Sequence, residues 1–289
     1  MNSTKIGFIG LGEMGKPMAI NLLNHGFAVA TCSHVRKQAA EDIKAFGADI
    51  LSSPKEVAAV SDVVITMVRD VPQTDEVIYG KGFWDGKGVW QGIRAGCPVM
   101  VCSTLLPSYC RKLAGDGKRF QVDVLDAPVS GGYAMAESGG LTFMIGGNQD
   151  TFSKCLHVFE AMGQNIFFIG GPGTGQAMKL INNYMMIINS FGTSEAIAVG
   201  LRAGLELRPM LEIIGKSSGN STVIQNWERL AASHQKNRKT QPRDKSIFTK
   251  DLELAVSFFN ELGFKTRLGN MVLKMDESRL FPVSDKGPD

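Results

Sequence analysis

Residues 5–25 read KIGFIGLGEMGKPMAINLLNH. An apolar run at residues 5–9 leads into a GxGxxG pattern at Gly10, Gly12 and Gly15, and an amphipathic segment follows. A strand, a glycine turn and a helix in this order are the context in which the pattern binds a dinucleotide. Gly10 permits the tight turn, Gly12 lets a pyrophosphate approach the backbone, and Gly15 lets the helix pack on the strand.

The residues between these glycines belong to the same expected phosphate site. Free N–H groups and the helix dipole at a helix N-terminus attract negative charge. The expected cofactor-binding residues of the turn are Gly10, Leu11, Gly12, Glu13, Met14 and Gly15. A strand–helix turn that holds no ligand is the alternative interpretation.

The end of the second expected strand indicates which dinucleotide binds. An NAD-preferring site usually has an acidic residue about 20 positions after the glycine turn, to hold the ribose 2′-hydroxyl. Residues 15–40 contain no Asp or Glu, and residues 31–37 read TCSHVRK. Hydroxyl and cationic side chains suit a 2′-phosphate, so we expect NADP(H) to be preferred over NAD(H). The expected ligands are Ser33, His34 and Arg36. Alternatively, the cations only form the solvated first turn of a helix.

The first part of the chain alternates apolar strand segments with helical segments. We expect strands at residues 5–10, 28–33, 62–68, 98–102, 122–127, 141–147 and 166–170, and helices at residues 14–25, 36–46 and 151–162. Continuous apolar runs are typical of strands that are buried on both faces of a parallel sheet. The alternation therefore predicts an α/β domain at residues 1–170, with a doubly wound Rossmann sheet.

The character of the sequence changes near Gly170, and no convincing strand follows. Residues 176–203 predict one long helix, apolar on nearly every face and therefore buried all round. We expect further helices at residues 208–216, 222–233 and 247–262. In this interpretation residues 171–289 form an all-helical domain, which we expect to bind the substrate and to mediate oligomerisation.

Composition excludes several classes of partner. Hydrophobic residues make up 44% of the 289 residues and the formal net charge is +3, which calls for neither nucleic acid nor a membrane. The cysteines are odd in number without a CxxC pair, and the histidines are scattered, so we expect no disulfide framework and no metal site. We expect a cytoplasmic protein.

Two further motifs carry chemistry. Residues 126–132 read DAPVSGG, where a strand ends in a turn whose backbone N–H groups can hold a small anion such as a carboxylate. The expected substrate ligands there are Ser130, Gly131 and Gly132, and an ordinary loop is the alternative.

The second motif is at residues 173–183, GTGQAMKLINN, where the long helix begins. Lys179 and Asn183 are four residues apart and share one helical face. The helix dipole and burial both favour the neutral amine of Lys179, which suits proton exchange near neutral pH. A solvent-facing lysine is the alternative.

Together these segments resemble the β-hydroxyacid dehydrogenases, the group of 3-hydroxyisobutyrate dehydrogenase, tartronate semialdehyde reductase and the glyoxylate/succinic semialdehyde reductases. The matching pieces are GFIGLGEMGKPMAINLL from Gly7, DAPVSGG from Asp126 with GGLTFMIGG after it, GPGTGQAMKLINN from Gly171, and KDLELA from Lys250. They occur in the family's order and extend to about Leu262. One departure is the aromatic segment at residues 79–96.

The resemblance implies a role for each matching residue. Lys179 corresponds to the catalytic lysine and Asn183 to an asparagine that orients the substrate, while the turn from Ser130 holds the substrate carboxylate. The cofactor residues implied are Met67, Val68, Ser103, Thr104 and Lys250, with Asp251 next to the last. The resemblance also implies a homodimer or homotetramer.

The sequence thus predicts an oxidoreductase that moves a hydride between NADP(H) and a small β-hydroxyacid or its semialdehyde, with Lys179 as general acid and base. An imine reductase is one alternative, although that class generally has an acid or tyrosine at the position of Lys179. A non-catalytic dinucleotide-binding scaffold protein is the other, although such proteins lose this lysine.

Overall fold

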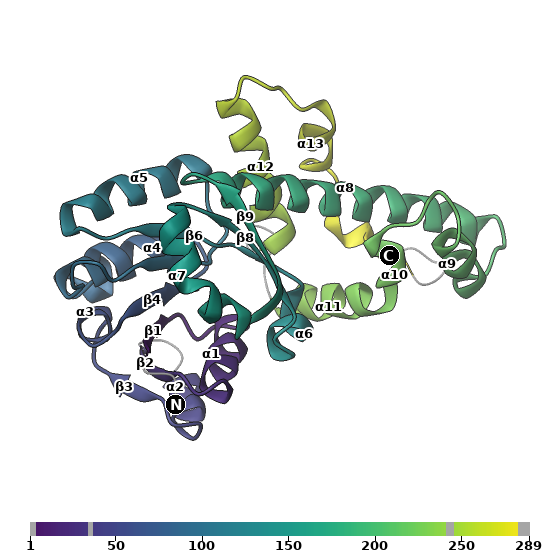
Figure 1. Cartoon of the computed structure of the whole chain (residues 1–289). Helices are drawn as coiled ribbons and strands as arrows, with labels where there is room; N and C mark the ends of the chain where they lie inside the picture. Colours follow the sequence, from purple (N-terminus) through teal and green to yellow (C-terminus); the bar gives the residue numbers. More distant parts are fainter. Residues whose placement is uncertain (1–3, 34–36, 241–245, 283–289) are drawn as a thin grey trace. The chain divides into compact units, whose positions relative to one another are not determined.

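The chain forms two compact units, Met1–Lys179 and Leu180–Asp289. The computed structural model describes residues 4–33, 37–240 and 246–282, and Figure 1 shows their course from purple to yellow. Each unit has its own hydrophobic core. In the described residues no helix is long and apolar enough to span a bilayer.

The first unit is an α/β fold with one sheet. Within the described residues, nine strands belong to it. They are β1 (Lys5–Ile9), β2 (Ala28–Cys32), β3 (Asp49–Leu51), β4 (Val63–Thr66), β5 (Val99–Val101), β6 (Val124–Asp126), β7 (Val129–Ser130), β8 (Leu141–Gly146) and β9 (Gly163–Gly170). This confirms the predicted Rossmann-type domain.

The strand order locates the place where a ligand binds in such sheets. The path is β3-β2-β1-β4-β5-β6-β8-β7, with β9 paired to β8. The pairs from β3 to β6 are all parallel, whereas β8 runs antiparallel to β6 and β7. The order reverses between β1 and β4, and in open α/β sheets ligands bind outside the carboxyl ends of the strands at such a switch point.

Helices cover both faces of this sheet. They are α1 (Gly15–Asn24), α2 (Lys37–Lys44), α3 (Pro54–Ala59), α4 (Val71–Asp75), α5 (Pro107–Gly117), α6 (Gly132–Glu137) and α7 (Gln149–Glu160). Phe8 packs with residues of α1, α2 and α7, and its neighbour Ile9 packs with residues of α3 and α5 on the other face. Successive strand residues point to opposite faces, so a continuously apolar strand is buried on both.

The aromatic segment at residues 79–96 belongs to the second of these cores. It forms the end of the π-helix η1 (Glu76–Gly80) and the short 3-10 helices η2 (Gly82–Trp84) and η3 (Val89–Gln91). Trp84 and Trp90 are both buried, and Trp90 stacks on Phe120. The two tryptophans therefore serve the packing of the α/β unit, whereas Phe83, which lies between Tyr79 and Trp84 in the chain, is 61% exposed.

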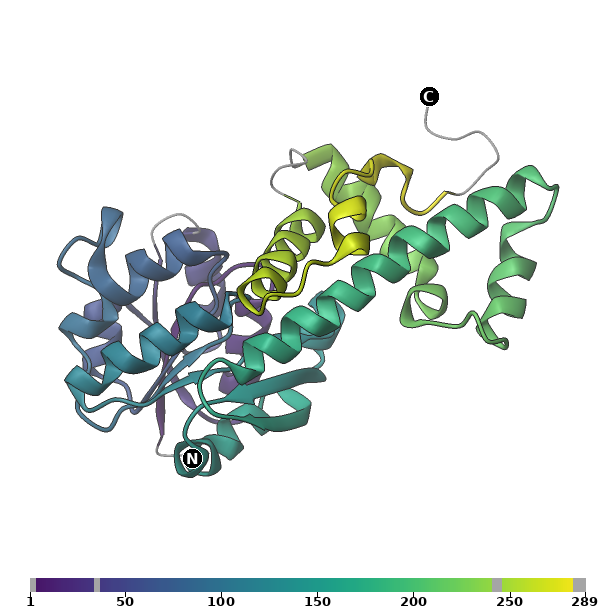
Figure 2. The same ribbon diagram turned by 90° about the horizontal axis from the view of Figure 1, so that it is seen from above.

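The second unit is helical. Helix α8 (Thr174–Arg202) begins in the first unit and continues without a break into the second, as Figure 2 shows along its length. The other helices are α9 (Leu207–Gly215), α10 (Thr222–Gln225), α11 (Trp227–Thr240), α12 (Ile247–Glu261), α13 (Arg267–Val272) and the 3-10 helix η6 (Glu277–Arg279). Ile187 and Phe191 of α8 pack with Leu252 and Val256 of α12 in this core.

Several expectations need correction. The strands β3 and β7 were not predicted, and the helix expected at residues 222–233 is two helices that meet at Asn226. Helix α8 is not buried all round, because the apolar side chains of Met178, Ile181 and Met185 are 39%, 41% and 59% exposed. These three residues share a face at helical spacing. The helix therefore has a buried face and a solvent-facing one.

Candidate active site

The glycine turn lies at the carboxyl end of β1, at the switch point of the sheet. Gly10 has φ +109°, and a Cβ there would lie 2.3 Å from the carbonyl oxygen of Met67, which follows β4. A Cβ on Gly15 would lie 1.9 Å from the carbonyl oxygen of Gly10. Both positions therefore require glycine for the turn to form, whether or not a ligand binds.

Gly12 differs from its neighbours, because a Cβ there would meet no atom within 4 Å. The fold alone thus gives no reason for glycine at this position, whereas the approach of a pyrophosphate does. Beside the turn lies a cavity of about 770 Å³, which Leu11, Gly12 and Glu13 line together with Lys16 and Lys37. The turn fits a dinucleotide phosphate on this geometry.

The strand end that bears on NADP(H) preference is described only in part. Ser33 is half-buried directly after β2. The other two expected ligands, His34 and Arg36, lie outside the described residues. Lys37 begins α2 and lines the cavity beside Gly12.

The loops after β4 and β5 are tied to each other. The backbone N–H of Met67 donates to the carbonyl oxygen of Ile9 at 2.9 Å, and that of Val68 donates to Oγ of Ser103 at 3.1 Å. Ser103 is buried and Thr104 is half-buried. The structure therefore brings together three of the loops that were expected to face the cofactor.

The expected carboxylate turn follows β7, which pairs with β8 from Ser130 to Thr142. Gly131 and Gly132 are both exposed and have φ values of +133° and +70°, which side chains other than glycine rarely adopt. A Cβ on Gly131 would also lie 2.5 Å from Cβ of Met135. This backbone bend is a structural feature that requires the two glycines.

Lys179 and Asn183 lie one turn apart on α8, and both are buried, with 8% and 4% of their surface exposed. The alternative of a solvent-facing lysine is therefore wrong. Side chains four residues apart on a helix are neighbours on its surface, so the amine and the amide lie on one face of α8.

Asn183 is held by a carboxylate from α12. Its Nδ2 donates to Oδ2 of Asp251 at 2.7 Å, and Nζ of Lys250 forms an ion pair with Oδ1 of the same carboxylate at 3.0 Å. Asp251 is buried, and its two partners offset the cost of burying its charge. The amide of Asn183 is thus fixed in orientation, with a second N–H remaining on Nδ2.

Two buried polar residues were not predicted as part of the site. Gln176 is fully buried in the first turns of α8, and Asp126 is buried at the end of β6. Burial raises the pKa of Asp126 to about 6, against the backbone N–H groups of Gly173 and Gln176, which favour its charged form. A polar residue three positions before Lys179 shares its helical face, and this spacing was the available signal for Gln176.

Comparison with known proteins gives two family models that match this chain. Residues 5–170 match the model of the NAD-binding domain of 6-phosphogluconate dehydrogenase, and residues 173–279 match that of the NAD-binding region of NADP-dependent 3-hydroxyisobutyrate dehydrogenase. The crystal structure of 3-hydroxyisobutyrate dehydrogenase from Salmonella typhimurium superposes with a TM-score of 0.79 at 29% identity, covering 94% of this chain and 92% of that one. An imine reductase from Myxococcus stipitatus shares only the fold, at 16% identity and a TM-score of 0.67, over 94% of this chain and 91% of that one.

The chain is also similar in sequence to curated dehydrogenases. Mitochondrial 3-hydroxyisobutyrate dehydrogenase of Mus musculus is 38% identical over 75% of this chain, and the match spans 63% of that protein's length. NAD-dependent L-serine dehydrogenase of Pseudomonas aeruginosa is 35% identical over 94% of this chain and 90% of its own. Two family models match consecutive parts of the chain, and the Pseudomonas aeruginosa relative aligns over 90% of its own length. The chain therefore belongs to the β-hydroxyacid dehydrogenase family.

Proposed function

We propose that this protein oxidises a small β-hydroxyacid to its semialdehyde, with a nicotinamide dinucleotide as cofactor. In the reverse direction it reduces the semialdehyde to the β-hydroxyacid. The buried pair of Lys179 and Asn183 on one face of α8 is the observation that carries the proposal. Lysine is rarely buried in proteins, because transfer of its charge out of water is costly. A buried lysine amine one helical turn from an asparagine amide can give a proton to, or take one from, a substrate oxygen as a general acid and base.

The cofactor is held by this chain's strand-end loops in the proposal. The turn from Gly10 to Gly15 holds the pyrophosphate, and the loops at Met67–Val68 and Ser103–Thr104 flank the rest, with Lys250 near the reacting end. The nicotinamide, when bound, accepts or supplies the hydride. The acid-free strand end at residues 31–37 favours NADP(H), whereas the serine dehydrogenase of Pseudomonas aeruginosa is NAD-dependent.

The residues of the chain handle the proton and the substrate. In oxidation, neutral Lys179 takes the proton of the substrate hydroxyl, and in reduction the protonated amine returns it to the carbonyl oxygen. Asn183, whose orientation Asp251 fixes, donates its second N–H to the same oxygen. Ser130, Gly131 and Gly132 bind the carboxylate.

The names of the relatives support this substrate class. They are dehydrogenases of 3-hydroxyisobutyrate in Mus musculus, of 2-(hydroxymethyl)glutarate in Eubacterium barkeri and of L-serine in Pseudomonas aeruginosa. All three compounds have a carboxylate and a hydroxyl on the carbon β to it. A primary alcohol on the carbon next to the carboxyl-bearing carbon is therefore the chemistry that we propose for this site.

A spectrophotometric screen tests the proposal. NADP⁺ and NAD⁺ are each combined with L-serine, 3-hydroxyisobutyrate and threonate, and NADPH and NADH with glyoxylate, succinic semialdehyde, tartronate semialdehyde and methylmalonate semialdehyde. We expect turnover of at least one β-hydroxyacid or semialdehyde, with a higher kcat/KM for the phosphorylated cofactor. Dinucleotide binding without turnover of any of these compounds would contradict the proposal and leave the scaffold protein and the imine reductase as the alternatives.

We also propose that the protein forms a homodimer or homotetramer. The exposed apolar side chains of Met178, Ile181 and Met185 on α8 support this, because contiguous exposed apolar residues mark interaction surfaces. Light scattering after size-exclusion chromatography gives the mass in solution, and a monomer would contradict this part of the proposal.

A further inference from the structure

The side chain of Gln176 joins helix α8 to the loop that follows β5. Its Nε2 donates to the carbonyl oxygen of Ser103 at 2.7 Å, and its Oε1 accepts from the backbone N–H of Leu105 at 3.0 Å. Gln176 is fully buried, so no water competes for these groups. A glutamine that satisfies one donor and one acceptor on the same loop fixes both the distance and the rotation of the helix against that loop.

The backbone of the same residue is joined to β6. Oδ2 of Asp126 accepts from the N–H of Gln176 at 2.9 Å, and Oδ1 accepts from the N–H of Gly173 at 2.7 Å. The N–H of Gln176 belongs to the first turn of α8 and that of Gly173 lies just before the helix begins. N–H groups at the start of a helix have no partner within it. Asp126, at the end of β6, therefore serves as the acceptor for the start of the helix.

Close backbone contacts hold the start of α8 in place. A Cβ on Gly175 would lie 2.3 Å from the carbonyl oxygen of Met144 and 2.7 Å from that of Asp126. A Cβ on Gly146 would lie 2.7 Å from Oδ1 of Asp126 and 2.8 Å from the N–H nitrogen of Gly175. The first turn of the helix thus packs directly on β6 and β8, with no room for a side chain in between.

The spacing along the helix connects this anchor to the proposed chemistry. Gln176, Lys179 and Asn183 are at positions i, i+3 and i+7, which share one face of a helix. The rise from Gln176 to Lys179 is about 4.5 Å. A rotation or shift of the helix at Gln176 therefore moves the amine of Lys179 by a comparable distance relative to the loop at Ser103.

We propose that Gln176 and Asp126 are positioning residues, which set the place of the Lys179 amine relative to the Ser103–Leu105 loop. The inference rests on the proposed function, in which Lys179 exchanges the proton and this loop flanks the cofactor. Val68 also donates to Ser103. One hydrogen-bond network therefore connects the loops after β4 and β5, the strand β6 and the helix α8. Displacing a catalytic group by about 1 Å can cost about 100-fold in rate.

The Gln176→Met variant removes both side-chain hydrogen bonds and keeps the length of the side chain. With the compound that the screen shows to be turned over best, we expect kcat to fall by about 100-fold. We expect KM and the dissociation constant of the dinucleotide to stay within about twofold of wild type. The assay is run at a temperature at which circular dichroism shows the variant to be folded, so that lost fold does not account for lost rate.

The Gln176→Glu variant supplies a rescue. Its protonated carboxyl can again donate to the carbonyl oxygen of Ser103, whereas the carboxylate cannot. We expect its kcat relative to wild type to rise as the pH is lowered, and this ratio decides the matter alone if Gln176→Met does not fold. Ser190→Ala is the matched control, because Ser190 is also buried on α8 but donates only to Met186 of its own helix. Its kcat should stay within about twofold.

The possible results separate this inference from the proposed function. A folded Gln176→Met variant with kcat within about threefold of wild type, or with a raised KM and unchanged kcat, overturns the positioning role and leaves the proposed function standing. A flat ratio of Gln176→Glu to wild-type kcat across pH overturns it as well. A wild-type protein that turns over no β-hydroxyacid or semialdehyde of the screen contradicts the proposed function, and this inference falls with it.

Discussion

At the scale of single residues, the three glycines of the turn serve different physical ends. Gly10 has a positive φ, and any Cβ there would collide with the backbone of Met67, while a Cβ on Gly15 would collide with the backbone of Gly10. Gly12 faces open space. The fold requires the first and third glycines, and only a ligand requires the second.

These differences predict opposite effects of two alanine substitutions. Gly10→Ala should lower the free energy of unfolding by about 2 kcal/mol or more, because the strained φ and the collision act together. Gly12→Ala should change it by less than about 0.5 kcal/mol but weaken dinucleotide binding by at least about tenfold, because the methyl group occupies the place of the pyrophosphate. Urea unfolding and fluorescence titration with NADPH measure the two quantities. Unimpaired NADPH binding by Gly12→Ala would contradict the phosphate role of this turn.

Asp126 makes stability depend on pH. Its pKa is about 6 in the fold against an ordinary value of 3.8, because burial opposes the charged form. Between these two values the native protein holds the proton more tightly than the unfolded chain does. The free energy of unfolding therefore falls as the pH rises from about 4 through 6, by about 3 kcal/mol from this residue.

Comparison of Asp126→Asn with wild type isolates this effect. The variant does not titrate, so its loss of stability relative to wild type should be largest near pH 4 and should shrink as the pH rises past 6. Urea unfolding of both proteins from pH 4 to 7.5 follows the difference. A difference that does not vary with pH would show that Asp126 titrates as an ordinary carboxyl.

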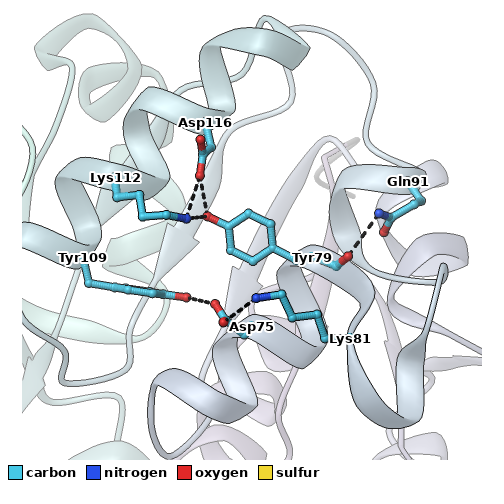
Figure 3. Close-up of polar contacts among 7 residues, drawn as sticks. All are labelled: Asp75, Tyr79, Lys81, Gln91, Tyr109, Lys112 and Asp116. Atoms are coloured by element: carbon cyan, nitrogen blue, oxygen red, sulfur yellow. Dashed lines mark hydrogen bonds and ion pairs between the residues drawn. The ribbon is translucent and has the colours of Figure 1, made fainter.

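At the scale of elements, a polar cluster ties the segment after β4 to the helix after β5. Figure 3 shows Asp75 of α4 and Tyr79 of η1 facing α5. Tyr109 donates to Asp75 at 2.6 Å, and Tyr79 donates to Asp116 at 2.6 Å and accepts from Lys112 at 2.7 Å. Burial and the bond to Asp116 raise the pKa of Tyr79 to about 12, so it stays a donor.

Removal of the Tyr109 hydroxyl measures how much this cluster contributes to the free energy of unfolding. Tyr109→Phe keeps the ring and loses the bond to Asp75, so it should lower the free energy of unfolding by about 1 kcal/mol. Tyr133→Phe is the control, since the hydroxyl of Tyr133 bonds to Glu137 of the same helix and its side chain is exposed. The urea midpoint should drop for the first variant and not for the second. Equal midpoints for both variants would mean that the cluster adds nothing to stability.

The elements also show what a sequence reveals about this fold. Apolar runs long enough to cross the sheet, such as β1 and β8, were predicted to within a residue. The strands β3 and β7 were missed. They have three and two residues and lie at the two ends of the strand path. Glycine spacing located the turn, and helical spacing paired Lys179 with Asn183. For Gln176 the only local signal is its spacing from Lys179, and its hydrogen bonds could not be predicted, because both partners are more than 70 residues away in the chain.

At the scale of the whole molecule, one helix belongs to both units. The division of the chain falls between Lys179 and Leu180, so the proposed catalytic lysine is in the first unit and Asn183 in the second, on continuous α8. The boundary between the predicted cofactor domain (residues 1–170) and the predicted substrate domain (residues 171–289) stays a prediction. An unbroken helix keeps the two side chains in fixed register, which makes their spacing independent of the loops in either unit.

The proposed reaction makes its sharpest demand on Lys179. The Lys179→Ala variant removes the group that exchanges the proton, and positioned acid–base groups are worth about 100- to 10,000-fold in rate. Lys216→Ala, which removes an exposed lysine paired with Glu212 on α9, controls for loss of positive charge. Neither variant should change dinucleotide binding, because the glycine turn is intact in both.

Steady-state oxidation of the best β-hydroxyacid substrate by wild type, Lys179→Ala and Lys216→Ala therefore decides between an enzyme and a scaffold. We predict that kcat falls by about a thousandfold in Lys179→Ala, with an unchanged dissociation constant for NADPH and wild-type turnover in Lys216→Ala. Turnover by Lys179→Ala close to that of wild type, with NADPH still bound, would contradict the assignment of Lys179 as general acid and base.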